Sequence, residues 1–272
     1  MAAFVHRGGR TTSHQLGSNR RIGKFASGKH VFAGEVVGEK VLELDAGCMT
    51  EIILDGTGKS VREHALKGLR TMAPIDRPTK IVCIGLNYRG HIAEMKAATP
   101  QVPLIFSKPS SAIIGPGEAI VRPRVSARVD YEGELALVIG TRASHTEDGG
   151  RHIFGYTCLN DVTARDLQKT DPDWTRAKGF DTFAPVGPYI AGNAPTRVVT
   201  RLNGRTVQDC PLSDRVFDDA ELVEYISTVM TLEPGDMIAT GTPSGISPMK
   251  AGDVVEVELD GIGCLRNPVV DG

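Results

Sequence analysis

The sequence predicts a mixed, β-rich α+β fold in which a small N-terminal unit precedes a larger one. Many short runs of apolar, β-branched and aromatic residues are separated by Gly and Pro, which is typical of closely spaced strands. Few stretches are long enough for a helix, and a proline-rich connection over residues 73–78 marks the boundary between the units. Neither GxGxxG after a strand nor GxxxxGKS/T occurs, which argues against the commonest nucleotide-binding loops.

The small unit is assigned to residues 21–75. A helix is expected over residues 60–72, after several short strands. The expected strands, which alternate with glycine, are 21–25, 30–32, 35–37 and 40–44.

The first 34 residues carry no acidic side chain, as in some organelle transit peptides. Gly8, Gly9 and Gly17 disfavour an amphipathic helix there, and the segment has no long apolar face. Residues 1–20 are therefore predicted to be a disordered basic extension.

The large unit is assigned to residues 76–272. A helix capped by Asn87 is expected to run to about Ala97, and another over residues 219–232. Because long helices are few, we expect a rolled or sandwiched β-sheet. The predicted strands are 80–84, 104–106, 119–121, 129–139, 153–159, 188–190, 198–202, 236–240, 253–259 and 263–270.

Composition argues against several classes of function. The formal net charge is -2 and aromatic residues make up 5%, so neither nucleic acid nor an anionic membrane is an expected partner. No apolar run approaches the roughly 20 residues that span a bilayer. The five cysteines are scattered without a CxxC pair, which suits a reducing compartment, and a cytoplasmic location is expected.

The most informative stretch is the predicted strand 129–139. Alternation of side chains places Asp130, Glu132 and Glu134 on one face. Like charges on one face repel unless they are compensated, and Mg²⁺, Mn²⁺ or Ca²⁺ would compensate them. A solvated polar face of an edge strand fits equally well. The other face is a core face and carries Tyr131, Leu135, Leu137 and Ile139.

Asp161 lies where the strand 153–159 ends, a usual place for a metal ligand. Taken alone, it is better interpreted as a helix N-cap. Asp166, a few residues later, is expected to pair with Arg165 or another nearby cation.

His91 and Glu94 are three residues apart and would share one face of a helix. Such a pair can orient and activate a water as a general base, although a surface contact is the commoner role. No HExxH motif accompanies the pair, so zinc is not indicated.

Lys178 and Thr242 stand in two further loops of interest. Lys178 could stabilise an enolate, and the alternative is a lysine at a sheet edge with its charge in water. Thr242 follows a strand in a Gly/Pro-rich loop that could bind an anion, or simply form a tight turn.

Six motifs occur in one order between about Lys80 and Val270. Together they closely resemble the fumarylacetoacetate hydrolase family, and residues 21–44 resemble its small N-terminal domain. The motifs are GLNYRGHIAEM, PLIFSKPSSAIIGPGEAI, VDYEGELALVIG, GYTCLNDVTARDLQ, KGFDTFAPVGP and LEPGDMIATGTPSG.

The resemblance implies a fumarylacetoacetase C-terminal-like β-roll, a catalytic domain at 76–272 and a homodimer. It implies Glu132, Glu134 and Asp161 as ligands of Mg²⁺, or of Mn²⁺ or Ca²⁺. It also implies a mobile lid around His91. The other implied roles are a water-handling pair in His91 and Glu94, an active-site lysine in Lys178, and substrate contacts in Gln168 and Thr242.

The sequence also departs from the family pattern. Some relatives carry Arg between the Gly and Asn of the GxNY motif, where this chain has Leu86, and Arg89 is a candidate to replace that substrate contact. Gly90 stands where many relatives have an acidic or polar residue, and the loop over residues 244–250 is short.

The implied activity is metal-dependent cleavage of a small 2-oxo or 2,4-dioxo acid by a hydrolase or lyase, through an enolate. The alternatives are an isomerase or decarboxylase of unsaturated dicarboxylic 2-oxo acids in aromatic catabolism, and a non-catalytic metal-binding homologue. The complete set of His91, Glu94, Lys178 and the carboxylates argues against the last.

Overall fold

Strand β11 (Gly133–Ile139), fully buried, lies inside a large sheet that positions the rest of the fold. The structure is a computed structural model that describes residues 15–56 and 58–272. Leu135, Leu137 and Ile139 enter one hydrophobic core, while Ala136 and Val138 enter another on the opposite face. This alternation is the expected one for a strand covered on both sides.

Within the described residues the large sheet has twelve strands. Two lie off its main path: β5 (Arg70–Met72) pairs with β1, and β8 (Ile113–Ile114) with β14. The main path runs through β4 (Ser60–Ala65), β3 (Lys40–Leu44), β2 (His30–Val37), β1 (Arg21–Ser27), β14 (Ala184–Ala191), β12 (Ile153–Asn160), β11, β17 (Met237–Ala239), β6 (Ile81–Gly85) and β7 (Leu104–Lys108).

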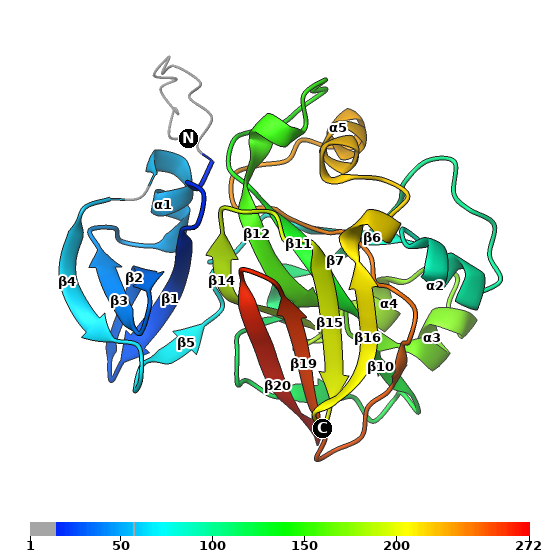
Figure 1. Cartoon of the computed structure of the whole chain (residues 1–272). Helices are drawn as coiled ribbons and strands as arrows, with labels where there is room; N and C mark the ends of the chain where they lie inside the picture. The colour runs from blue at the N-terminus through cyan, green and yellow to red at the C-terminus, as the bar shows by residue number, and fades with distance from the viewer. Residues whose placement is uncertain (1–14, 57) are drawn as a thin grey trace, which may run out of the picture.

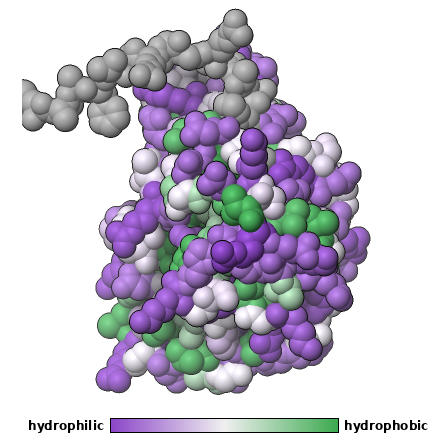
Figure 2. All heavy atoms as spheres, turned by 90° about the vertical axis from the view of Figure 1, so that its left-hand side faces the viewer, coloured by the Kyte–Doolittle hydropathy of each residue, from purple (hydrophilic) through white to green (hydrophobic). Residues whose placement is uncertain are grey.

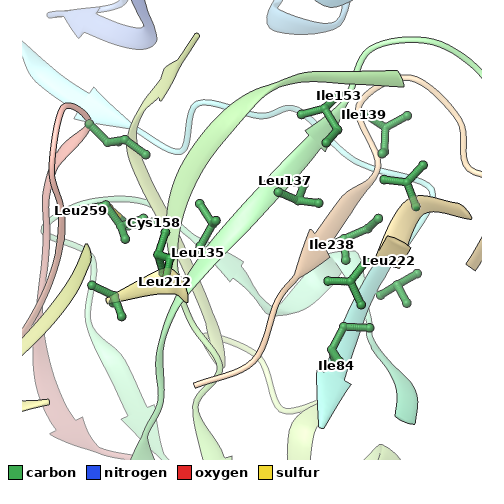
Figure 3. Packing of buried hydrophobic residues seen from close by; sticks show 14 of the residues in the cluster. Ile84, Leu135, Leu137, Ile139, Ile153, Cys158, Leu212, Leu222, Ile238 and Leu259 are labelled. Carbon is green, nitrogen blue, oxygen red and sulfur yellow. The ribbon is translucent and has the colours of Figure 1, made fainter. Parts of the chain in front are cut away.

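A five-stranded sheet packs across β14, β12 and β11, in front of them in Figure 1. Leu135 and Cys158 of the large sheet meet Leu259 of the smaller one in a shared core (Figure 3). This two-layer β-roll confirms the predicted β-rich fold class. The strands of the second sheet are β16 (Arg205–Pro211), β15 (Arg197–Leu202), β19 (Val254–Leu259), β20 (Gly263–Asp271) and β9 (Ile120–Arg122).

A third, three-stranded sheet and short helices border the roll. The sheet consists of β13 (Thr163–Ala164), β10 (Val129–Tyr131) and β18 (Ser247–Pro248). The helices α2, α3 and α4 lie to the right in Figure 1, away from the N-terminal strands. The α-helices are α1 (Met49–Asp55), α2 (Arg89–Glu94), α3 (Arg165–Thr170), α4 (Thr175–Lys178) and α5 (Asp219–Val229).

The N-terminal unit differs from its prediction in two elements. The helix expected over residues 60–72 is wrong, because β4 pairs with β3 and β5 pairs with β1. The helix α1 was missed, and it buries Met49, Ile52 and Ile53. Residues 60–72 form strands because they pair with neighbouring strands, and local periodicity cannot reveal such pairing.

The face of the N-terminal unit shown in Figure 2 is mostly hydrophilic, with smaller hydrophobic areas.

Part of the predicted disordered extension is ordered. The prediction for residues 1–14 lies outside the described residues. Leu16, however, is buried, and its N–H donates to the carbonyl of Phe154 at 2.8 Å. The absence of a side chain at Gly192 permits this contact, because a Cβ there would lie 2.3 Å from the carbonyl oxygens of Leu16 and Gly17.

Two predicted helices have different ends. Tyr88, not Asn87, occupies the N-cap of α2, which ends at Glu94 and not near Ala97. Asn87 instead joins two loops: its amide donates to the carbonyl of Thr240 at 2.8 Å and accepts from the N–H of Phe217 at 2.9 Å. Helix α5 begins at a capping box of Asp218 and Glu221 and ends at Val229, before the predicted end at residue 232.

None of the helices in the described part of the chain combines the length and hydropathy of a transmembrane span.

Candidate active site

A cavity of about 280 Å³ opens between the short helices and the ends of β6 and β7. Its wall combines apolar side chains with a dense group of charged ones. The lining residues are Ile84, Gly85, Leu86, His91, Met95, Ala97, Phe106, Glu132, Glu134, Asp161, Arg165, Gln168, Lys169, Trp174, Lys178 and Thr242. Apolar walls with convergent polar groups are typical of small-molecule sites.

Glu132, Glu134 and Asp161 form a buried carboxylate cluster at one part of this cavity. One carboxylate oxygen of each lies within 4.8 Å of the others. Strand pairing brings the three together: Gly133 on β11 faces Asn160 on β12, and the N–H of Asp161 donates to the carbonyl of Glu132 at 2.8 Å.

The predicted continuous strand 129–139 is interrupted at Glu132, between β10 and β11. As a result Asp130 does not join the cluster by strand alternation, which corrects the expectation of a shared carboxylate face. Asp130 belongs to the three-stranded sheet, and its carboxylate pairs with Arg128 at 2.9 Å and with Arg165 at 2.9 Å.

Lys178 and Lys108 hold the two oxygens of Asp161. The Lys178 Nζ lies 2.6 Å from Oδ2 of Asp161 and 2.9 Å from Oε2 of Glu132. The Lys108 Nζ lies 2.6 Å from Oδ1 of Asp161 and 3.0 Å from the carbonyl of Val162. Both lysines are buried, so the interpretation of Lys178 as a sheet-edge lysine is wrong.

The pKa values of Glu132 and Glu134 shift in opposite directions because their neighbours differ. Burial alone would raise the pKa of Glu132, but Lys178 and the guanidinium of Arg165 outweigh it and hold that pKa well below its usual range. Burial raises the pKa of Glu134 well above its usual value, and the charges of Asp161 and Glu132 raise it further. Its carboxylate accepts a hydrogen bond from the N–H of Gly241 at 2.8 Å.

This donor set fits a hard divalent cation. Three converging carboxylates are ligands that Mg²⁺, Mn²⁺ and Ca²⁺ prefer, whereas a zinc site generally includes Cys or His ligands. Burial and the charges of Asp161 and Glu132 both raise the pKa of Glu134, and a dication bound here would favour its ionised form.

His91 and Glu94 form the predicted contact on α2. The Nδ1 of His91 lies 2.9 Å from Oε2 of Glu94, and the N–H of Gly245 donates to Oε1 of Glu94 at 3.1 Å. His91 lines the same cavity as the carboxylate cluster. The ring nitrogen Nε2 therefore remains for a ligand.

Two of the three predicted substrate contacts line the cavity. Gln168 lines the cavity and accepts from Arg165 at 2.6 Å, which leaves its amide NH₂ for a ligand. Thr242 also lines it, with its hydroxyl donating to the carbonyl of Gly133 at 3.0 Å and accepting from Gln208 at 2.8 Å. Arg89 is not brought to the cavity: it is exposed, and its guanidinium donates to the carbonyls of residues 214 and 215.

Sequence reasoning missed Lys108 and Arg165 as members of the site. Lys108 ends the apolar strand β7, and a lysine buried at such a position almost always has a carboxylate partner. Its place in the sequence could therefore have indicated a role in the site. Arg165 was considered only as a partner of Asp166. In the structure Asp166 accepts from Ser126 at 2.6 Å and from the N–H of Ala127 at 2.8 Å instead.

Comparison with known proteins identifies the family of this chain. Residues 80–270 match the family described as fumarylacetoacetate (FAA) hydrolase C-terminal, and the chain belongs to that family. The oxaloacetate tautomerase of Bacillus subtilis is 42% identical over 226 residues, covering 76% of this chain and 75% of that protein.

Two solved structures illustrate the range of activities. The 2-hydroxyhepta-2,4-diene-1,7-dioate isomerase from Mycobacterium marinum superposes with a TM-score of 0.82 at 40% identity, covering 93% of this chain and 98% of that one. The maleylpyruvate hydrolase from Sphingobium superposes with a TM-score of 0.78 at 30% identity, covering 93% and 100%. Enzymes with this fold thus include isomerases, tautomerases and hydrolases.

Proposed function

We propose that the protein is a divalent-metal-dependent enzyme that transfers a proton between the keto and enol forms of a small 2-oxo acid. The observation that carries the proposal is one cavity lined by both a carboxylate cluster and His91, which contacts Glu94. Identity to the tautomerase and the isomerase, at 42% and 40%, exceeds the 30% to the maleylpyruvate hydrolase and the 33% to a fumarylacetoacetate hydrolase of Exiguobacterium antarcticum, which supports proton transfer as the first candidate.

Glu132, Glu134 and Asp161 would hold Mg²⁺ or Mn²⁺. When bound, such a cation would supply Lewis-acid chemistry to the 2-oxo acid. The ammonium of Lys178, which lies 2.6 Å from Asp161 in the same cavity, would stabilise negative charge that develops on the enol oxygen. Phe106 and Trp174, whose rings meet edge to face, contribute aromatic surface to the wall of the same cavity.

His91 would move the proton. Its Nδ1 faces the carboxylate of Glu94, which keeps the ring and its Nε2 oriented. Nε2 then takes a proton from C3 of the keto acid and returns one to C3 or to the enol oxygen. Glu94 is a positioning residue here, fixed in turn by the N–H of Gly245.

Hydrolysis of a carbon–carbon bond in a 2,4-dioxo acid is the second candidate. The side chain of Glu94 is 36% exposed, so a water can reach the His91–Glu94 pair. In that reaction the pair takes a proton from the water, which attacks the distal carbonyl and releases an enolate.

The test is to chelate the purified protein, add back Mg²⁺ or Mn²⁺, and supply a panel of 2-oxo acids in D₂O. The panel is oxaloacetate, acetylpyruvate, fumarylpyruvate and an unsaturated dicarboxylic analogue. Metal-dependent exchange of the C3 protons or decay of the enol absorbance, with the carbon skeleton intact, supports tautomerisation or isomerisation. Pyruvate with a second acid would indicate hydrolysis, and CO₂ would indicate decarboxylation. Tight metal binding without turnover of any member would contradict the proposal.

A further inference from the structure

One face of helix α3 extends from the carboxylate cluster to the mouth of the cavity. Arg165, Gln168 and Lys169 all line the cavity, and their spacing of three and four residues places them on one helical face. Their exposure increases in that order: Arg165 is buried, Gln168 is half-buried and Lys169 is exposed. With a rise of 1.5 Å per residue, Lys169 lies about 6 Å further along the helix than Arg165.

The cations deep in the cavity are already engaged. Arg165 pairs with Asp130 and Glu132, and Lys178 pairs with Glu132 and Asp161. Neither is free to bind a second acidic group of a substrate without leaving a buried carboxylate uncompensated, which is costly.

Lys169 differs from Arg165 and Lys178 because its charge has no partner in the part of the chain that the structure describes. No hydrogen bond or ion pair holds its ammonium there. The acidic side chains next to it on the chain are satisfied elsewhere: Asp166 accepts from Ser126 and the N–H of Ala127, and both oxygens of Asp171 accept from Arg176. The cavity mouth therefore presents a positive charge that no neighbouring carboxylate neutralises.

We propose that Lys169 binds the distal carboxylate of a dicarboxylic 2-oxo acid and so determines which substrates the site accepts. This inference rests on the proposed function, which places the 2-oxo acid end at Glu132, Glu134 and Asp161. The substrate's carbon chain then passes the apolar side chains at the cavity wall, and its far carboxylate reaches Lys169 at the mouth. Since Lys169 is exposed, water weakens the contact, and its effect is on selectivity.

The experiment compares oxaloacetate with its 4-methyl ester, which has the same chain without the distal charge. The variant Lys169→Met is expected to raise KM for the diacid about fivefold to tenfold, to leave KM for the ester unchanged, and to keep kcat within about twofold. Lys169→Glu should raise KM for the diacid further. Added salt should raise KM for the diacid in the wild type more than in Lys169→Met.

Lys96→Met is the matched control. Lys96 is exposed and follows Met95, which lines the cavity, but Lys96 itself does not line it. The deciding quantity is the ratio of the KM for the diacid to the KM for the ester. The proposal would be overturned if Lys169→Met left this ratio unchanged, or if Lys96→Met changed it equally.

A binding measurement separates this proposal from the proposed function. Calorimetric titration of the metal-loaded wild type and Lys169→Met uses oxaloacetate and oxalate, which offers only the chelating end. Weaker binding of oxaloacetate alone in the variant supports Lys169 even if no turnover is found. Equal losses for both ligands, or no loss for either, contradict it, whereas absence of turnover in the wild type contradicts only the proposed function.

Discussion

Glu132 and Glu134 are two residues apart and contribute oxygens to the same buried cluster, yet their pKa values move in opposite directions. Both are subject to burial, which raises the pKa of a carboxyl group. Glu132 faces Lys178 and Arg165, which overcome that effect. Glu134 has no salt-bridge partner among the described residues and is raised further by its neighbours' charges. This asymmetry underlies the first two predictions.

Glu134→Gln is expected to remove metal binding and, at pH values above the folded pKa of Glu134, to raise the Tm of the chelated protein. The substitution keeps the shape of the side chain, and in that pH range it removes a charge that repels Asp161 and Glu132. Calorimetric titration with Mg²⁺ or Mn²⁺ and thermal unfolding in a chelator measure the two effects. Wild-type metal affinity in this variant would refute Glu134 as a ligand.

Metal binding is expected to release a proton and to strengthen as pH rises. The folded pKa of Glu134 lies above its unfolded value. In the chelated protein, the contribution of Glu134 to the free energy of unfolding is therefore fully present below the unfolded pKa. It is lost as pH rises through the folded pKa. Since the metal needs the ionised carboxylate, titrations in two buffers of different ionisation enthalpy should show proton release that declines above the folded pKa. Proton release that is zero at every pH would contradict the assignment.

His91→Gln is expected to lower kcat by about 10²–10⁴-fold while leaving metal affinity unchanged. The imidazole lines the cavity but is not one of the clustered carboxylates, so only the proton-transfer step loses its base. Glu94→Gln should cause a smaller loss, because it retains a hydrogen-bonding group beside Nδ1. A large loss of metal affinity in His91→Gln would instead place His91 among the ligands.

Lys108→Met is expected to destabilise the protein by about 3–5 kcal/mol, because it leaves Oδ1 of the buried Asp161 without its cation. Urea unfolding of the chelated protein measures the loss. Lys80→Met offers a contrast: Lys80 also pairs with a buried carboxylate, Asp236, but Thr79 and a backbone N–H also donate to that group. A loss in Lys108→Met no larger than in Lys80→Met would contradict the prediction.

Gly133→Ala is expected to destabilise the junction between Glu132 and Glu134 by about 1–3 kcal/mol. A Cβ at this position would lie 2.0 Å from Oγ1 of Thr200. That hydroxyl is buried without a hydrogen-bond partner in the described structure, so Thr200→Ala costs little by itself. The double variant should recover much of the stability in urea unfolding, and strict additivity of the two losses would refute the steric account.

Much of the large domain could be predicted from local pattern. The alternation of Leu135, Leu137 and Ile139 identified a core face, and the spacing of His91 and Glu94 identified a helical contact. These features depend on residues close in sequence, whose relative direction follows from strand or helix geometry. The helix expected over residues 60–72 failed because strand pairing with β1 and β3 decided that segment.

The amino-acid pattern was enough to predict the β-rich class, the family and the residue types of the candidate site. The ion pairs could be seen only in the folded chain: Lys108, 53 residues from Asp161, holds one of its oxygens, and Asp130 pairs with Arg128 and Arg165. The tertiary structure also decided that Arg89 lies away from the cavity while Lys169 stands at its mouth. The physical reason is that an ion pair depends on distance in space, and pairing between strands far apart in the sequence sets that distance.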